Sequence, residues 1–132
     1  MTHEAVHSDR LSRPVGVFEQ GVRVPAGGHL IFASGMTSRA RDGSVVGKGD
    51  ARAQTRKILE NLQALLAEAG ATLDDVFKVT VYVKDMKDFK AIHDVRREFF
   101  VGRLPASTMV EVSRFVDDDM LVEIEAIAHV PG

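Results

Sequence analysis

The amino-acid sequence predicts an α+β domain of two layers, in which a mixed β-sheet carries two helices on one of its faces. Two segments, 50–69 and 89–101, repeat apolar residues at intervals of three and four, the spacing of a single helix face. Segments 76–84 and 120–128 instead alternate in side-chain character, as strands do. The predicted order is strand, strand, helix, strand, helix, strand, strand. The chain of 132 residues is long enough for one domain with its own core.

The first two predicted strands are 15–24 and 29–34, joined by a turn at 25–28. The turn contains one proline and two glycines, and glycine adopts positive φ angles without steric cost. The second strand ends in Ser34 and Gly35. A glycine at the end of a strand predicts a bulge or a close approach of the backbone to another group.

The longer helix is predicted to begin after Asp50, a good N-cap residue, and to end at Ala69 with Gly70 in the C′ position. Its apolar face comprises Ile58, Leu59, Leu62, Leu65, Leu66 and Ala69. Packing of this face into the core is the favoured interpretation, although a partner-binding amphipathic helix has the same pattern. The second helix is predicted from Phe89 to Val101, after the capping cluster 85–88.

The last two predicted strands, 105–115 and 120–128, are joined by an acidic turn of three aspartates. One side of the final strand is wholly apolar, and Glu123 and Glu125 lie on the other. By periodicity alone, a solvated sheet face accounts for both carboxylates. Apolar residues expected on that second face, where they need a partner, are Ile31, Leu121 and Ile127.

Composition excludes several classes of function. The net charge of −2 gives no excess of positive charge with which to bind nucleic acid. Cysteine is absent, which excludes disulfides, thiolate catalysis and a cysteine zinc site, and the five histidines lack metal-ligand spacing. Residues 1–13 are polar and contain no apolar run for a signal peptide or a membrane span. We therefore expect a flexible N-terminal tail, a cytoplasmic protein, and no membrane, nucleic-acid or metal partner.

The final third reads Pro105-Ala-Ser-Thr-Met-Val-Glu-Val-Ser-Arg114, followed by Val122-Glu-Ile-Glu-Ala-Ile-Ala128. Upstream motifs are Phe32-Ala-Ser-Gly35, Ala53-Gln-Thr-Arg56, Glu60-Asn-Leu62, Ala69-Gly70, and Val79-Thr-Val81 to Lys84-Asp-Met86. In this order they resemble the RidA/YjgF family, the reactive-intermediate imine deaminases. The resemblance begins near Pro14, so residues 14–132 are expected to form a single domain of this family.

The resemblance implies a chorismate-mutase-like fold and a homotrimer whose sheets pack into a central barrel, with clefts between subunits. It also implies hydrolysis of a small imine or enamine to a keto compound and ammonia. Such a reaction needs no cofactor, because water attacks a carbon that is already electrophilic. The requirement is a positioned substrate and an acceptor for the proton of the water.

Glu123 matches the family glutamate that orients this water, whereas Glu125 matches a more structural position. Residues that match the substrate-binding cleft are Phe18 (where the family usually has Tyr), Ser34, Gly35, Thr108 and Met109, the last through its backbone groups.

Ser107 departs from the family pattern, which has an arginine that grips a substrate carboxylate with a bidentate fork. A neutral hydrogen bond contributes about 1 kcal/mol, against roughly 1.5–3 kcal/mol for a charged one. We therefore expect a substrate altered from the standard 2-imino acid. Arg96, or a protonated His93, is a candidate replacement cation contributed across an interface. The alternative is that both are solvated residues of the second helix.

Three functions remain open on sequence alone. The first is a deaminase of a small imine or enamine with altered substrate, and the second is a non-catalytic trimer that binds a small metabolite in the same cleft. The third is a structural or chaperone-like trimer. Retention of Glu123 favours the first over the third.

Overall fold

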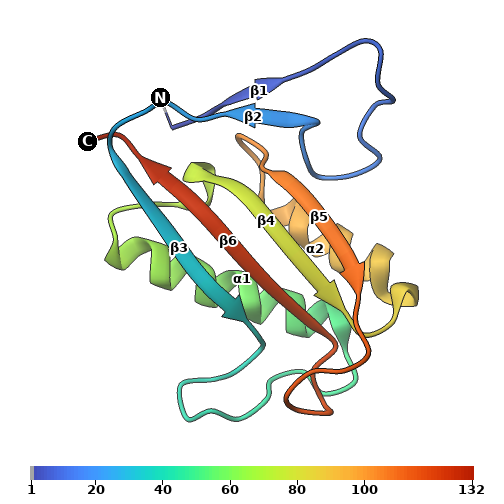
Figure 1. The fold of residues 1–132 in the computed structure, drawn as a ribbon. Helices are drawn as coiled ribbons and strands as arrows, with labels where there is room; N and C mark the ends of the chain where they lie inside the picture. Colours follow the sequence, from blue (N-terminus) through green and yellow to red (C-terminus); the bar gives the residue numbers. More distant parts are fainter. Residues whose placement is uncertain (1) are drawn as a thin grey trace.

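The computed structural model describes residues 2–132, which form a four-stranded sheet, a two-stranded ribbon and two helices (Figure 1). The main sheet has the strand order β3–β6–β4–β5. Its strands are β3 (His29–Met36), β6 (Val122–Val130), β4 (Val76–Val83) and β5 (Ala106–Glu111). Strand β6 is antiparallel to both of its neighbours, whereas β4 and β5 run parallel. The predicted mixed sheet is confirmed.

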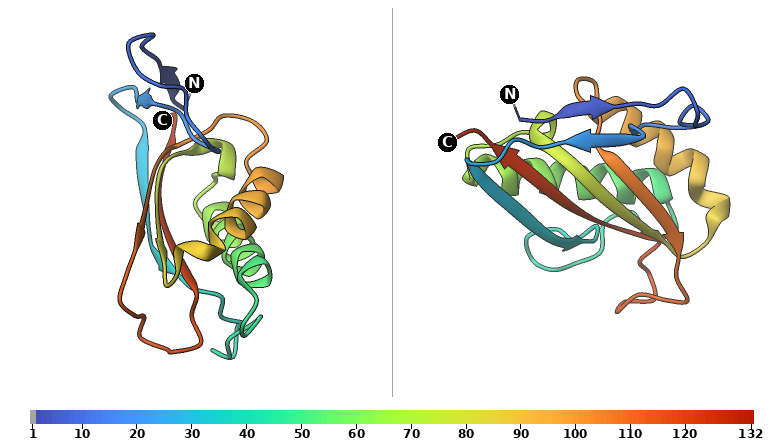
Figure 2. Two further views of the ribbon diagram at one scale, coloured as in Figure 1. Left: turned by 90° about the vertical axis from the view of Figure 1, so that its right-hand side faces the viewer. Right: turned by 45° about the horizontal axis from the view of Figure 1, so that its top comes forward.

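Helices α1 (Ala51–Glu68) and α2 (Phe89–Phe99) lie together on one face of this sheet (Figure 2). Asp50 caps α1 by accepting a hydrogen bond from the backbone N–H of Ala53. Gly70 follows the helix with a φ of +73°, a conformation that favours glycine. Both predicted ends of the longer helix and the two-layer α+β architecture are confirmed.

Two single turns of 3₁₀ helix, η1 (Leu73–Asp75) and η2 (Met86–Asp88), precede β4 and α2. The side chain of Asp85 caps η2 by accepting from the N–H of Lys87. Helix α2 ends at Phe99, before the predicted end. The reason is that Phe100 leaves the helical conformation, with φ −93° and ψ 83°, and packs into the core.

The core lies between the helices and the sheet. Four alternating apolar side chains of β6 are at least 97% buried, which confirms the inward face predicted for residues 122–128. They are Val122, Ile124, Ala126 and Ala128. The facing helix residues include Ile58, Leu59, Leu62 and Leu66 of α1 with Ile92 and Val95 of α2.

The outer face of the sheet is not covered by either helix (Figure 2). Some of its apolar side chains are exposed. Phe32 is 70% exposed and Leu30 is 55% exposed. The prediction that Ile31 lies on this face is wrong. Ile31 pairs with Ala128 and packs against the core, because directly opposed residues of an antiparallel pair share a face. The register of β3 therefore turns Phe32, paired with Ile127, outward.

The N-terminal segment contains a strand that the sequence analysis missed. Strand β1 (Glu4–Val6) pairs antiparallel with β2 (Gly21–Arg23) as a separate ribbon. The first predicted strand, 15–24, is reduced to β2, and residues 15–20 are irregular except for a single bridge to β5. Side chains of α2, rather than a neighbouring strand, bind the backbone of Val17 in this segment.

Gln54, which is buried in α1, ties two loops to the helix. Its Nε2 donates to the carbonyl oxygens of Gly47 (3.2 Å) and Asp119 (2.8 Å). Its Oε1 accepts from the N–H of Leu121 at 2.8 Å. Leu121 directly precedes β6, so this side chain helps to set where the central strand begins.

We expect Gln54→Ala to lower the free energy of unfolding by roughly 2–3 kcal/mol, because the three hydrogen bonds of a fully buried side chain are lost. Urea denaturation measures this difference. Gln63→Ala is the matched control, since Gln63 is exposed on the same helix and should change stability by less than about 0.5 kcal/mol. Equal effects of the two substitutions would contradict the role given to Gln54.

Candidate functional site

Glu123 lies on the outer face of β6, beside a bulge in β3. The pairing register shifts between Ala33 and Met36, so β3 holds one more residue than β6 across Ser34 and Gly35. A β-carbon on Gly35 would lie 2.2 Å from Oε2 of Glu123. The carboxylate is thus packed directly against the Gly35 backbone, and a side chain at position 35 would displace it. The close approach predicted from the Ser34–Gly35 pair is present.

The two carboxylates of β6 differ in their hydrogen bonding. The Tyr82 hydroxyl of β4 donates a short hydrogen bond to Glu125, and this bond raises the pKa of Tyr82 above its ordinary value. Glu123 accepts no hydrogen bond from residues 2–132. Its lone pairs are therefore available to a ligand or a water, whereas Glu125 is already engaged.

Sequence reasoning missed the part played by Tyr82. Its alternation in β4 places it on the outer face, and the pairing of β4 with β6 sets it opposite Glu123, from where its hydroxyl reaches the diagonal neighbour Glu125. The register between two distant strands has no signal in a single sequence.

A second cluster lies at the other edge of the sheet. Ser107 of β5 pairs with the buried Val79, so its side chain points to the helix side. There Nη2 of Arg96 donates to Ser107 Oγ at 3.1 Å and to the carbonyl oxygen of Val17 at 3.4 Å. The hydroxyl proton of Ser107 is left free to donate, because its oxygen accepts from Arg96.

Arg96 is a buried cation without an anionic partner. It is 2% exposed, and no carboxylate of residues 2–132 forms an ion pair with it. Burial lowers the pKa of Arg96 to about 10, so the guanidinium is still charged at neutral pH. The interpretation of Arg96 as a solvated helix residue is wrong, since it links α2, β5 and the irregular segment before β2.

His93 is neutral in this geometry. Its Nε2 accepts a hydrogen bond of 2.8 Å from the N–H of Val17, so its proton resides on Nδ1. The ring stacks on Phe89 with a centroid distance of 4.9 Å. Burial, followed by the charges of Arg96 and Arg97, lowers the pKa of His93 below 6.5. These contacts argue against a protonated His93 as the replacement cation.

One chain does not bring the two clusters together. Glu123 and Gly35 lie on the outer face at β6 and β3, whereas Ser107 and Arg96 lie at β5 and on the helix side. Strand β4 separates β6 from β5, and adjacent strands are about 4.8 Å apart. The sheet itself therefore stands between the clusters.

The remaining predicted cleft residues divide between the two faces. Thr108 lies on the outer face, where its hydroxyl accepts from Nζ of Lys78 at 2.9 Å. Met109 lies on the helix side and packs against the core. Phe18 helps to line an open hollow of about 560 Å³ formed by the segment from His7 to Gln20.

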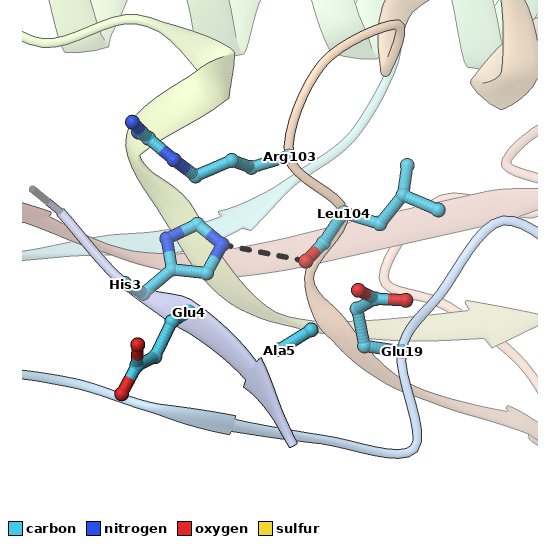
Figure 3. A pocket seen from close by; sticks show the side chains of 6 residues that line it. All are labelled: His3, Glu4, Ala5, Glu19, Arg103 and Leu104. Atoms are coloured by element: carbon cyan, nitrogen blue, oxygen red, sulfur yellow. Dashed lines mark hydrogen bonds between the residues drawn. The ribbon is translucent and has the colours of Figure 1, made fainter. Parts of the chain in front are cut away.

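A further hollow, of about 550 Å³, lies between β1 and the loop before β5 (Figure 3). His3 lies in its wall and donates from Nε2 to the carbonyl oxygen of Leu104 at 3.3 Å. Among the charged groups of the lining, Glu4 is paired with Arg23 and Arg103 with Asp74, and Glu19 lies 3.4 Å from Nε2 of His7. Most charged groups of this lining already have partners, so the candidate site stays with Glu123.

Residues 2–132 contain neither a metal-binding cluster nor a membrane-spanning helix. No cluster of three or more His, Asp or Glu side chains in this part of the chain is arranged to hold a metal ion. No helix within the same residues is long and apolar enough to cross a membrane.

Comparisons with known proteins give several close matches. The family described as Endoribonuclease L-PSP matches residues 10–130. A RutC family protein of Pyrococcus abyssi is 40% identical over 129 residues, which covers 98% of each chain. Protein DfrA of Myxococcus xanthus is 34% identical over 128 residues, covering 97% of this chain and 96% of that protein.

Solved structures with the same fold include two of particular interest. A protein of unknown function from the conserved Rid family, YyfB of Yersinia pestis, superposes with a TM-score of 0.90 at 26% identity, covering 98% of this chain and 100% of that chain. E. coli TdcF with bound serine gives a TM-score of 0.71 at 30% identity, covering 96% of this chain and 98% of that chain.

We expect Gly35→Ala to displace the Glu123 carboxylate, because the added methyl overlaps Oε2, and to change the free energy of unfolding by less than about 1 kcal/mol, because Oε2 is the end of a side chain that can move. Urea denaturation and a crystal structure of the variant measure the two effects. Gly21→Ala is the control, since a β-carbon there has its nearest neighbour at 3.8 Å. An unmoved Glu123 in Gly35→Ala would show that the bulge does not constrain the carboxylate.

Proposed function

The chain belongs to the Endoribonuclease L-PSP family, which confirms the resemblance to the RidA/YjgF proteins, and from this premise we propose that it is a hydrolytic deaminase of a small imine or enamine. Membership of this family supports a small-molecule deaminase or a related role. The observation that carries the finer proposal is the Glu123 carboxylate, which is packed against Gly35 and accepts no hydrogen bond from residues 2–132.

In the proposed reaction Glu123 accepts a proton from a water whose oxygen attacks the carbon of the C=N bond. The nitrogen takes up the proton, giving a tetrahedral carbon that carries a hydroxyl and an amine. Transfer of the hydroxyl proton to the amine nitrogen and cleavage of the C–N bond then release ammonia and leave a carbonyl group. Imine and water are thus converted to a carbonyl compound and ammonia, with positioning and one acceptor as the protein's contribution.

The proposed cleft lies between subunits, because a single chain holds its two clusters apart. In a homotrimer, the edge strand β5 of one copy with Ser107 meets Glu123 of the next. The same assembly covers the outer sheet face, where Phe32 and Leu30 are exposed.

The Ser107 hydroxyl is the proposed donor to the substrate in place of the arginine fork. The charged guanidinium of Arg96 donates a hydrogen bond of 3.1 Å to Ser107 Oγ. A hydroxyl that accepts from a cation is a stronger donor than an isolated one. Serine, the ligand bound to the relative TdcF, has the carboxylate and the amino nitrogen expected of molecules of this class.

The second candidate function is a trimer that binds a small metabolite without turnover. Ser107 favours it, since one neutral donor holds a carboxylate less firmly than a bidentate fork does. Ammonia release from freshly generated imines separates the two candidates. Binding of a 2-keto acid without any release of ammonia would support the binding protein.

We expect Glu123→Gln to reduce the rate of ammonia release by about 10²–10⁴, because the amide cannot take the proton of the attacking water. Single-turnover assays on an imine generated in the same vessel measure the rate. Glu125→Gln is the matched control on the same strand, and it should retain most of the activity because Glu125 serves Tyr82. A larger loss in Glu125→Gln would move the role of acceptor to that residue.

We expect light scattering to give the mass of three chains at micromolar concentration. Phe32→Glu should yield smaller species, because it puts a charge on the outer sheet face that the trimer buries. Leu65→Glu, on the exposed side of α1 at 39% exposure, should leave the mass unchanged. A monomeric unmodified protein would overturn the intersubunit cleft.

A further inference from the structure

Both backbone polar groups of Val17 are bound by side chains of α2. The N–H donates to Nε2 of His93 at 2.8 Å, and the carbonyl oxygen accepts from Nη2 of Arg96 at 3.4 Å. Val17 is 5% exposed, so water does not replace these partners. A buried segment of this kind normally pairs with a strand. Here two side chains substitute for the strand.

The imidazole also fits the backbone sterically. A β-carbon on Gly16 would lie 2.1 Å from Nε2 and 2.2 Å from Cε1 of His93. The ring therefore touches the chain at Gly16 and Val17, and any shift of this segment towards α2 is blocked. The stacked Phe89 holds the ring from another side.

The same segment forms part of the candidate cleft. Phe18 follows Val17 directly, and the N–H of Glu19 donates to the carbonyl oxygen of Pro105 at 2.9 Å. Arg96 reaches Ser107 two residues further along the chain. The position of Phe18 is thus defined by α2 on one side and by the start of β5 on the other.

We propose that His93 is a positioning residue for Phe18: its neutral imidazole holds the Val17 N–H and thereby fixes the segment 16–19, and its protonation releases that segment. An imidazolium carries a proton on Nε2 as well, so two donors would face each other at the place of the present hydrogen bond. The segment must then move away from the ring.

Two further observations indicate that segment 16–19 moves away when His93 is protonated, rather than forming new contacts with the imidazolium. The buried Nδ1 of His93 has no hydrogen-bond partner among residues 2–132, so no acceptor is in place to stabilise an imidazolium. The charged groups that act on the ring all come from α2: Arg96 and Arg97 oppose its protonation and Asp94 favours it. Asp94 is itself bound by Lys90 and by Arg52 of α1. The residues packed on the ring from outside α2, Gly16 and Val17, carry no charge.

The direction of the pH effect follows from these contacts. The folded state lowers the pKa of His93 below 6.5, so below that pH the unfolded chain takes up a proton that the folded chain does not. The stabilising contribution of neutral His93 is therefore complete above pH 6.5 and is lost as the pH falls towards the folded-state pKa.

The test places a tryptophan at position 18 as a fluorescent reporter, since the sequence contains no other tryptophan. In Phe18→Trp we expect the emission to change in one step as the pH falls from 8 to 5, and nuclear magnetic resonance should show the Val17 amide titrating at the same pH as the His93 ring. At pH 8 the ring should be the tautomer protonated on Nδ1. Protonation on Nε2, or a Val17 amide that ignores the titration of His93, would overturn the proposal.

Substitutions at two sites separate positioning from general stability. His93→Gln keeps an acceptor that does not titrate, so the emission at pH 8 should be preserved and the acid step should disappear. His93→Leu lacks the acceptor and should show the released emission at every pH. His3→Gln is the control for the other buried histidine with a lowered pKa, and it should keep the step. An acid step that persists in His93→Gln would contradict the mechanism.

A pair of glycine variants tests the steric contact between the His93 ring and the backbone at Gly16. In the Phe18→Trp background, Gly16→Ala should shift the emission at pH 8 towards the released form, whereas Gly21→Ala should not. Identical spectra for these two variants would show that contact with His93 does not set the position of residue 18. Neither measurement depends on turnover, so both hold whether or not the proposed deaminase activity is found.

Discussion

The double pairing of β6 is the constraint on which the structure depends. This strand is hydrogen-bonded to β3 on one side and to β4 on the other, and its inner side chains are sealed under both helices. A slip of one residue would turn Val122, Ile124 and Ala126 out to solvent and bring Glu123 and Glu125 into the core. The burial of the apolar side therefore holds both carboxylates on the outer face, in one register.

That register then gives the two carboxylates different surroundings. Glu125 accepts from the hydroxyl of Tyr82, which reaches it diagonally from β4, and Glu123 meets the backbone of Gly35 at the bulge of β3. The difference arises from the neighbouring strands, since both residues are glutamates on the same face of the same strand. Bulges recur next to functional sites because they re-aim a strand locally without breaking the sheet.

Polar side chains of the helices organise the parts of the chain that lack strand partners. Gln54 of α1 binds two loops, and His93 with Arg96 of α2 binds the backbone of Val17. Arg96 is buried for this purpose without a counterion, a costly arrangement for a charge. Its hydrogen bond to Ser107 connects this structural role with the proposed cleft.

The sequence by itself determined the class of fold, the ends of α1, the inward face of β6 and the family, because these depend on local periodicity, capping residues and short ordered motifs. It also singled out Glu123, Gly35 and Ser107 as a group. Only the tertiary structure decided that β1 is a strand, that Ile31 points inward, and that Tyr82 serves Glu125. It likewise decided that His93 is neutral and that Arg96 is buried beside Ser107. Each of these features depends on which distant segments of the chain pack together. Neither the register between distant strands nor the burial of a side chain by a distant segment produces a periodic pattern in the sequence.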